Sequence, residues 1–318
     1  MSPRLRLTLS VALAAAVLAG LCAWSGVSPR AVVRAASTVP PGTLLAAFGV
    51  LIALYGARAW RIHRVLPEAS RPPWPRLSAA TAAWVLDAQV LPAKVGEATL
   101  IFHLGRLGVP RAEGFVALLV SRLLDLAVLL GAFGVAALAL GAGPTYGARL
   151  PWLTGLGAVL LPLSLGLALV VLRGARAWRP VPGLVARAGP RFARVHSFTQ
   201  RVGEALAALD RRRRVAALGA SLAVWALILA FYALLARGLG IDLPLLGLVF
   251  GASLAVLGGL VPASGFLGFG MLDVGWVAGF SALGVPRALA VESALGFHVL
   301  YLVGVGLLGV LGHVLVRR

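Results

Sequence analysis

Long apolar runs constrain the fold of this 318-residue chain more than any other feature of its sequence. A helix needs about 20 apolar residues to cross the hydrocarbon core of a bilayer. The chain offers runs at 7–25, 42–60, 77–91, 113–140, 150–172, 215–240, 243–261, 266–282 and 288–316. Hydrophobic residues make up 60% of the chain and charged residues 12%, whereas soluble domains carry about 25% charged residues. The sequence therefore predicts an all-α, polytopic integral membrane protein.

Two parts of this pattern are interrupted. The run 77–91 is short, ends at Pro92 and is followed by the equally short, partly polar segment 95–105. The runs 243–261 and 266–282 are separated only by VPAS, and the second is rich in glycine. Broken helices at membrane depth are tolerated only where protein or a water-filled cavity covers the freed backbone groups. We therefore expect about six full spans plus two re-entrant helical hairpins, with Pro92, Gly96, Pro262, Gly265 and Gly268 as candidate hinge or gate residues.

A repeated hexapeptide links the two hairpins. LGVPRA occurs at 107–112 and at 283–288, each time after an interrupted pair and before a long span that carries ionisable residues. An odd number of predicted crossings separates the copies, which places them on opposite sides of the membrane. Inverted repeats with broken helices are typical of secondary transporters, whose substrate site lies at the repeat interface. A duplication that kept a packing motif without transport is the alternative.

Arginine sets the expected orientation. The formal net charge is +19, with eleven Arg in 173–214 and five in 58–76. The positive-inside rule places both segments, and both termini, in the cytoplasm of a multi-pass cell-membrane protein. The basic residues flank apolar spans rather than a folded soluble face, so no nucleic-acid partner is expected. We expect one membrane domain, 1–318, divided into an anchor helix and outer loop (1–41), a first half (42–172), a basic cytoplasmic loop (173–214) and a second half (215–318).

Ionisable residues within spans are costly and by default mark pathways or ligands. The candidate substrate-binding residues are Lys94, Glu97, Arg122, Asp125, Asp273, Glu292 and His298. Arg122 and Asp125 share a helix face, and an unpaired charge at their depth would be expensive, so we expect them to pair. The functional interpretation is an anion site in which Lys94 and Arg122 meet a phosphate, while Glu97 and Asp125 hold these two basic side chains in place. A packing ion pair and an interfacial helix cap remain the structural alternatives, and Asp273 can equally be a cap.

Signs of catalysis, metal binding or cofactor binding are missing from the sequence. The single cysteine, Cys22, excludes a thiolate cluster, and no His, Asp and Glu residues have metal-ligand spacing. By spacing, His63, His103, His196 and His313 are isolated, and Asp87 stands alone in its run. No nucleotide-binding or hydrolase motif occurs. We expect no metal, no cofactor and no enzymatic activity.

Several of these motifs resemble a known family. LPAKVGE, LGVPRAEGFVALLVSRLLDL, VPASGFLGFG and ALGVPRALAVESAL are similar to the flippase-like family that includes the membrane half of lysylphosphatidylglycerol synthases. Over about residues 40–316, its first motif maps onto Pro92, Lys94, Gly96, Glu97, Arg122 and Asp125. The second motif departs from the family, because Met271 stands where an acid is expected and Asp273 follows two residues later.

The hypothesis that follows is a lipid translocase. It would move a phospholipid or lipid-linked, phosphate-bearing molecule between leaflets, so the expected partner is an anionic or phosphate-bearing membrane lipid. The resemblance does not extend to the soluble transferase domain of the synthases, which has no counterpart here. The alternatives are a non-transporting partner of a glycosyltransferase or other lipid-modifying enzyme, and an embedded transferase with Glu97 or Asp273 as its base.

Overall fold

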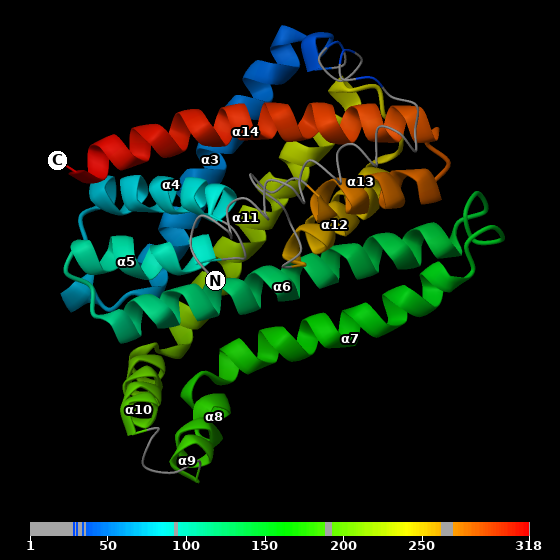
Figure 1. Ribbon diagram of the computed structural model, residues 1–318. Coiled ribbons are helices and arrows are strands. Elements are labelled where there is room, and N and C mark those ends of the chain that lie inside the picture. Colours follow the sequence, from blue (N-terminus) through cyan, green and yellow to red (C-terminus); the bar gives the residue numbers. More distant parts are fainter. Residues whose placement is uncertain are drawn as a thin grey trace.

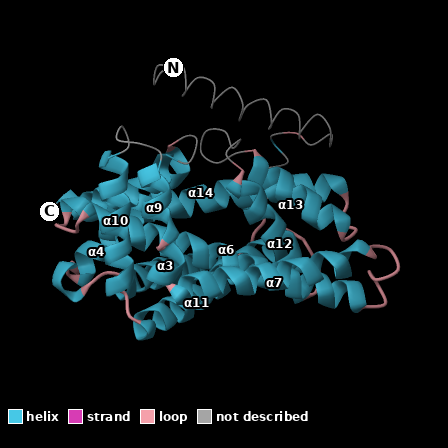
Figure 2. Cartoon of the chain, turned by 90° about the horizontal axis from the view of Figure 1, so that it is seen from below, coloured by secondary structure: helices cyan, strands magenta, loops and turns pink. Residues whose placement is uncertain are grey.

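The computed structural model describes residues 28, 30, 34, 36–91, 95–187, 193–261 and 270–317, and these residues form helices and short connections without a strand (Figures 1 and 2). The first half contains α3 (Pro41–Val65), η1 (Glu68–Ser70), α4 (Trp74–Val90), η2 (Val95–Ala98), α5 (Thr99–Arg106), α6 (Arg111–Ala142) and α7 (Trp152–Arg173). Then follow α8 (Ala175–Trp178), α9 (Pro180–Arg187), α10 (Ala193–Ala208), α11 (Arg211–Gly238), α12 (Leu245–Leu260), α13 (Met271–Ala282) and α14 (Arg287–Arg317). The all-helical, polytopic prediction is confirmed.

Five of the described helices, α3, α6, α7, α11 and α14, are long and apolar enough to cross a membrane. The predicted anchor run 7–25 lies outside the described residues. The interrupted runs became short helices, since α4 has 17 residues, α5 has 8 and α13 has 12. At about 1.5 Å per residue none of these three spans a core of about 30 Å. They form the two short helical hairpins α4–α5 and α12–α13.

The hairpins enter the bundle from opposite ends (Figure 1). The first LGVPRA copy joins α5 to α6, and the second joins α13 to α14. The Tyr146 hydroxyl, in the turn after α6, donates to the Leu283 carbonyl at 3.4 Å. The two copies therefore lie at opposite ends of α6, a helix of 32 residues and about 48 Å. This is the inverted arrangement that the sequence predicted.

Each LGVPRA copy folds in the same way. Gly108 and Gly284 have φ of +88° and +91°, a left-handed conformation that glycine adopts without steric cost. The amide of the next residue then donates to the carbonyl five positions earlier, Val109 to Leu104 and Val285 to Phe280, both at 3.1 Å. This is the Schellman motif that ends a helix. The proline that follows starts the next helix, so the hexapeptide encodes one tight turn between a hairpin and a long span.

Glycines let both hairpins pack backbone to backbone. A Cβ on Gly96 would lie 2.2 Å from the Asp87 carbonyl oxygen, and one on Gly258 would lie 2.1 Å from the Met271 carbonyl oxygen. Any side chain at either position would force the two arms apart. Gly96, proposed as a hinge, is thus a close-contact position between the arms of the first hairpin. Pro92, Pro262, Gly265 and Gly268 lie outside the described residues.

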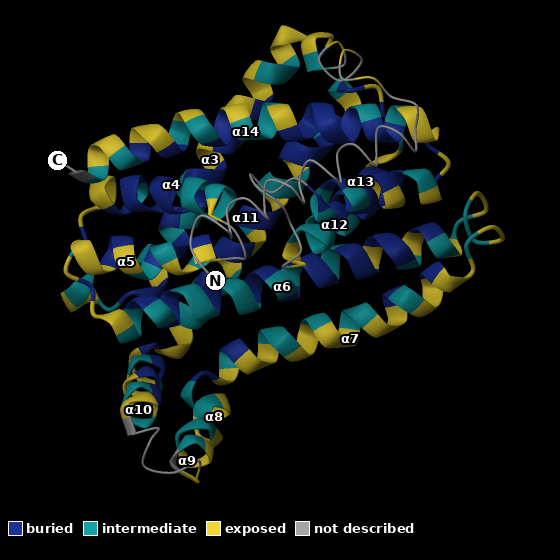
Figure 3. Ribbon diagram, in the orientation of Figure 1, coloured by how far each residue is buried: buried dark blue, intermediate teal, exposed yellow. Residues whose placement is uncertain are grey.

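The basic segments contain more helix than the apolar runs alone indicated. The run 42–60 continues as α3 through Val65, so Arg58, Arg61 and Arg64 lie on a helix. Segment 173–214 connects α7 to α11 through the short helices α8, α9 and α10, and α10 packs against α6. Burial is concentrated in α6, α13 and the first half of α14, whereas α7 is mostly exposed and lies at the periphery (Figure 3). Arg61, Asp125, Asp273 and His298 are among the buried ionisable side chains of the bundle interior.

Candidate functional site

Asp125 is the centre of a buried ion network. Its carboxylate accepts hydrogen bonds from Arg61 Nη1 at 2.5 Å and Nη2 at 3.2 Å, and from Arg122 Nη1 at 2.9 Å. The Trp225 indole donates to the same carboxylate at 3.0 Å. The pairing of Arg122 with Asp125, predicted from their spacing on one helix, is confirmed. The stronger partner is Arg61, because its guanidinium makes the bidentate contact.

Arg61 is a residue that the sequence interpretation missed as part of the site. Its side chain is 1% exposed, and Nη1 also donates to the Ser221 hydroxyl at 3.2 Å. Ser221 and Trp225 are one turn apart on α11, so α3 and α11 together fix Asp125 on α6. A signal was available in the sequence. The apolar helical pattern of α3 continues past Arg61 to Ile62 and Val65, both buried, and places Arg61 on the inward face.

Glu97 brings the first hairpin into this network. Its carboxylate forms an ion pair with Arg122 Nη2, and its backbone carbonyl accepts a hydrogen bond from the Trp84 indole at 3.1 Å. The Arg122 guanidinium carbon also lies 5.0 Å from the centroid of the Trp84 ring, within cation–π range. Glu97 was predicted to hold a basic side chain in place, and it holds that of Arg122. Lys94 lies outside the described residues.

Exposure separates the roles of the two arginines. The Arg122 side chain is 38% exposed, against 1% for Arg61. A guanidinium carries five N–H donors, and the described partners of Arg122 take two of them, on Nη1 and Nη2. Its Nε–H has no partner among the described residues. Arg61 is therefore a structural counter-ion, whereas Arg122 keeps donors for a further anion.

The second half holds a smaller pair. Asp273 is fully buried on α13, where one carboxylate oxygen interacts with His298 Nδ1 on α14 at 2.9 Å and the other accepts from the Gly270 amide at 2.9 Å. Asp273 is thus both the helix cap that the sequence allowed and the partner of an ionisable side chain. Glu292 is half-buried one and a half turns before His298 and forms no ion pair with any residue that the structure describes.

The two pairs occupy equivalent positions in the two halves. Asp273 follows Glu97 by 176 residues, and His298 follows Arg122 by the same offset. This offset also separates the LGVPRA copies, the ends of α5 and α13, and the starts of α6 and α14. The offset thus places acid with acid and basic partner with basic partner. Asp273 therefore occupies the position of Glu97 in the second half, although it stands two residues beyond the position at which the resemblance led us to expect an acid.

An aromatic cluster lies between the pairs. The Trp276 and Phe297 rings are tilted by 30° with centroids 4.6 Å apart, and the Phe297 and Tyr301 rings are parallel with centroids 6.0 Å apart. Tyr301 in turn accepts a hydrogen bond from Gln89 on α4 at 3.0 Å. The seven predicted site residues thus do not form one cluster. Those that the structure describes form two ion-pair sites, joined by aromatic packing from α13 through α14 to α4, with Glu292 outside both.

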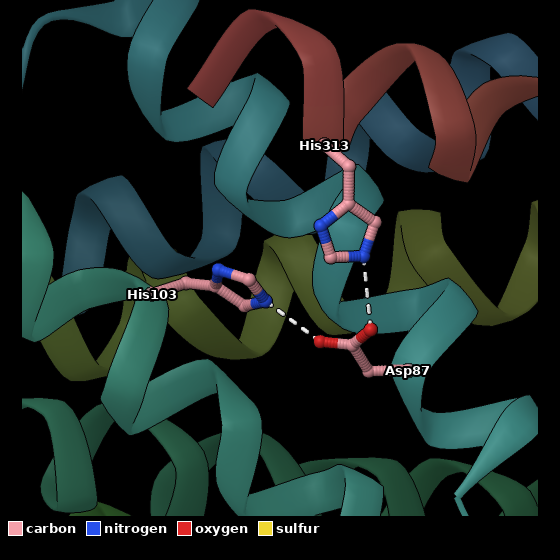
Figure 4. A group of neighbouring side chains, drawn as sticks. All are labelled: Asp87, His103 and His313. Atoms are coloured by element: carbon pink, nitrogen blue, oxygen red, sulfur yellow. Dashed lines mark hydrogen bonds and ion pairs between the residues drawn. The ribbon is translucent and has the colours of Figure 1, made fainter. Parts of the chain in front are cut away.

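Two histidines that seemed isolated in the sequence are not. His103 and His313 both contact Asp87, each through Nε2 and each at a different carboxylate oxygen, at 2.7 and 2.9 Å (Figure 4). The three residues belong to α5, α14 and α4. No sequence spacing could have found this cluster, because two of its members are more than 200 residues apart.

A basic pocket lies away from both pairs, at the junction of α7, α8, α10 and α11. Its cavity volume is about 430 Å³, and Arg173, Arg176, Arg211 and Arg214 line it together with Leu172, Ala175 and Ala207. Four arginines without an acid among the lining residues favour contact with an anionic headgroup at the membrane surface. This pocket does not include any of the paired residues.

Comparison with known proteins agrees with this picture. A family model, the lysylphosphatidylglycerol synthase transmembrane region, matches residues 8–309, which include both hairpins and both ion-pair sites. No match is found among curated proteins. The match begins before the residues on which the resemblance had been based, and takes in the N-terminal apolar run. It links the membrane domain to lipid handling. The chain is a multi-pass membrane protein of the lysylphosphatidylglycerol synthase transmembrane region family.

Proposed function

We propose that this protein is a lipid translocase that moves an anionic phospholipid, or a lipid-linked phosphate, between leaflets without changing it chemically. The observation that carries the proposal is two equivalent contacts, the ion pair of Glu97 with Arg122 and the hydrogen bond between Asp273 and His298, on two short hairpins that enter from opposite ends. An inverted repeat with broken helices is the architecture that lets one substrate site open to each side in turn.

In the proposed mechanism, Arg122 binds the phosphate and Glu97 competes with it. Asp125 holds Arg122 at a fixed position, because Arg61 and Trp225 anchor that carboxylate. Glu97, by contrast, lies on the hairpin and contacts Arg122 through only one of its carboxylate oxygens. A lipid phosphate that takes the donors used by Glu97 releases the hairpin from α6. Binding of the headgroup is thereby coupled to opening of the hairpin.

The charge balance of the network suits a phosphodiester. Arg58 lies on α3 one turn before Arg61, close enough for its charge to act on Asp125. Arg58, Arg61 and Arg122 carry three positive charges, and Glu97 and Asp125 carry two negative ones. The hydrogen-bonded residues alone, Arg61 and Arg122 with Glu97 and Asp125, are neutral as a group. Arg58 acts on Asp125 through space and adds one positive charge, which a headgroup with a single negative charge would neutralise. In a site without net charge, the desolvation cost of the buried phosphate would not be offset by attraction to an unpaired cation.

At the other end, Asp273 and His298 are 0% and 1% exposed, so they serve the same role for the opposite leaflet only when the hairpin α12–α13 opens. The hairpin α12–α13 carries the acid and α14 carries its partner, as in the first half. By the positive-inside rule the hairpin α4–α5 opens to the cytoplasm and α12–α13 to the outside. In this arrangement both termini are cytoplasmic and the protein resides in the cell membrane.

The test is translocation in reconstituted vesicles. A fluorescent anionic phospholipid is placed in both leaflets, and a membrane-impermeant quencher reports how fast inner lipid reaches the outer leaflet. Wild type should accelerate transfer over empty vesicles. Arg122→Gln should slow it by about 10- to 100-fold, since a charge-assisted hydrogen bond contributes about 1.5–3 kcal/mol.

The matched control is Arg106→Gln. Arg106 is exposed on the same hairpin, at the end of α5, and lies outside the ion network. It should transfer lipid at the wild-type rate. Equal rates for wild type and Arg122→Gln would refute the site. If wild type does not accelerate transfer and a lipid-modifying enzyme co-purifies with it in stoichiometric amount, the protein would instead be a non-transporting partner of that enzyme.

A further inference from the structure

Asp87, His103 and His313 converge from three helices on one point (Figure 4). Asp87 lies on α4, His103 on α5 and His313 on α14, so both arms of the first hairpin and the last helix contribute. Both imidazole rings direct Nε2 at the carboxylate, at 2.7 and 2.9 Å. The two rings lie edge to face, with centroids 5.5 Å apart. One potential ligand atom from each residue lies within 4.8 Å of the other two.

The cluster is enclosed on one side and accessible on the other. The His103 side chain is buried, at 5% exposure, whereas those of Asp87 and His313 are 20% and 33% exposed. The carboxylate and the His313 ring are thus only partly covered by the protein itself. The cluster is also separate from the ion network around Asp125, with which it shares no residue.

We infer that Asp87, His103 and His313 form a binding site for a divalent transition metal ion of the Zn²⁺ type. Two imidazole nitrogens and one carboxylate oxygen are ligands that Zn²⁺ accepts, whereas Ca²⁺ and Mg²⁺ prefer sites made of oxygen. Tetrahedral Zn²⁺ with bonds of about 2.0–2.1 Å places its ligand atoms about 3.3 Å apart. The present nitrogen-to-oxygen distances would need to open by about 0.5 Å, which rotation of the side chains can supply.

The same atoms also form hydrogen bonds in the absence of metal. Each histidine then donates its Nε2–H to one carboxylate oxygen, and the ion replaces both of these protons. Metal-bound histidines usually donate their other N–H to a second acceptor, but Nδ1 of His103 is buried and has no partner among the described residues. Loss of such support weakens binding by about 10- to 100-fold. The ion should therefore be exchangeable rather than permanent.

Binding would fasten the first hairpin to α14. These elements already approach closely, because a Cβ on Gly309 would lie 2.3 Å from Leu86 and one on Gly312 2.7 Å from the backbone of α4. Trp84, one turn before Asp87, packs beneath Arg122. An ion joining α4, α5 and α14 would hold the hairpin closed and slow translocation. This last consequence rests on the proposed function, whereas the binding itself does not.

Metal binding is measured on the full chain, purified without a polyhistidine tag and stripped with EDTA. Co²⁺ replaces Zn²⁺ as a spectroscopic probe, because tetrahedral Co²⁺ absorbs strongly in the visible range. Wild type should bind one Co²⁺ with this spectrum, lose the band when Zn²⁺ is added, and unfold at a higher temperature with Zn²⁺ than with EDTA. His103→Gln/His313→Gln should bind more than about 100-fold more weakly, because two direct ligands are lost.

His196→Gln is the matched control, since His196 is half-buried on α10 and remote from the cluster in sequence and fold. It should bind as wild type does. Equal affinity in the double variant, or an octahedral Co²⁺ spectrum in wild type, would overturn the site, as would no Zn²⁺-dependent change in unfolding temperature. If the double variant does not fold, Asp87→Asn and the wild-type spectrum decide the question.

The consequence for transport is tested separately, in the vesicle assay with Zn²⁺ or EDTA. Zn²⁺ should slow wild type and leave His103→Gln/His313→Gln unchanged. Zn²⁺ binding without slowing would refute the fastening of the hairpin but keep the metal site. Absence of translocation by EDTA-treated wild type would refute the proposed function instead.

Discussion

Removing Arg61 should destabilise the protein less than removing its partner Asp125. Arg61→Met leaves Asp125 with Arg122 and the Trp225 indole, so the carboxylate stays paired. Asp125→Asn leaves Arg61 charged, 1% exposed and without an acid among its described partners, and arginine does not lose its proton in proteins. Breaking a buried pair costs about 3–5 kcal/mol. We expect Arg61→Met to lower the free energy of unfolding by about 3 kcal/mol and Asp125→Asn to lower it by about 5 kcal/mol or more.

Thermal unfolding in lipid nanodiscs measures the difference. At roughly 2 °C per kcal/mol for a chain of this size, Arg61→Met should lower Tm by about 6 °C and Asp125→Asn by about 10 °C. The double variant Arg61→Met/Asp125→Asn should be more stable than Asp125→Asn alone, because no uncompensated buried cation remains. Arg64→Met is the control, since Arg64 is exposed one turn further along α3, and it should change stability by less than about 1 kcal/mol.

Two outcomes would refute this reasoning. If Arg61→Met costs no more than Arg64→Met, the buried bidentate contact does not stabilise the fold. If the double variant is as unstable as Asp125→Asn, the cost of that variant comes from lost hydrogen bonds to Asp125 rather than from an unpaired Arg61.

The hairpins and the topology give two further predictions. Gly96→Ala should destabilise the protein by about 1–3 kcal/mol in thermal unfolding, because its Cβ would overlap a carbonyl oxygen of α4. The control Gly105→Ala, with open space around it, should stabilise the protein by up to about 1 kcal/mol. Equal effects of the two variants would contradict the close contact at Gly96. In a Cys22→Ser background, Arg111→Cys and Arg287→Cys should react with an impermeant thiol reagent from opposite sides of the membrane. Labelling of both from one side would refute the inverted arrangement.

Much of the fold could be predicted from hydrophobicity alone. The limits of α6, α7, α12 and α14 lie within about two residues of the apolar runs, because a membrane helix needs a long run and proline or glycine ends it. The first hairpin was predicted for the same reason, since its arms are too short to span. Arg61 was misplaced because charge near the end of a run favours a loop, and only burial shows that α3 continues inward.

The site was only partly predictable. Arg122 and Asp125 are three residues apart on one helix, a spacing that implies contact. The bond from Arg61 to Asp125 joins residues 64 positions apart, and the contact of His313 with Asp87 joins residues 226 positions apart. Only the packing of helices decides such contacts. The pairing of Asp273 with His298 lay within reach, because the LGVPRA offset that aligns His298 with Arg122 also aligns Asp273 with Glu97. Comparison with an expected family motif had drawn attention to Met271 instead.

The proposed mechanism requires that Glu97 with Arg122 and Asp273 with His298 act in one translocation cycle. His298→Gln keeps a polar side chain beside Asp273 but removes the ionisable partner, and His196→Gln is its control on α10. In the vesicle assay, His298→Gln should slow transfer of the anionic lipid by at least about 10-fold, as expected for loss of a charge-assisted hydrogen bond, while His196→Gln transfers at the wild-type rate. A wild-type rate for His298→Gln, in protein whose unfolding temperature is unchanged, would contradict the proposed mechanism.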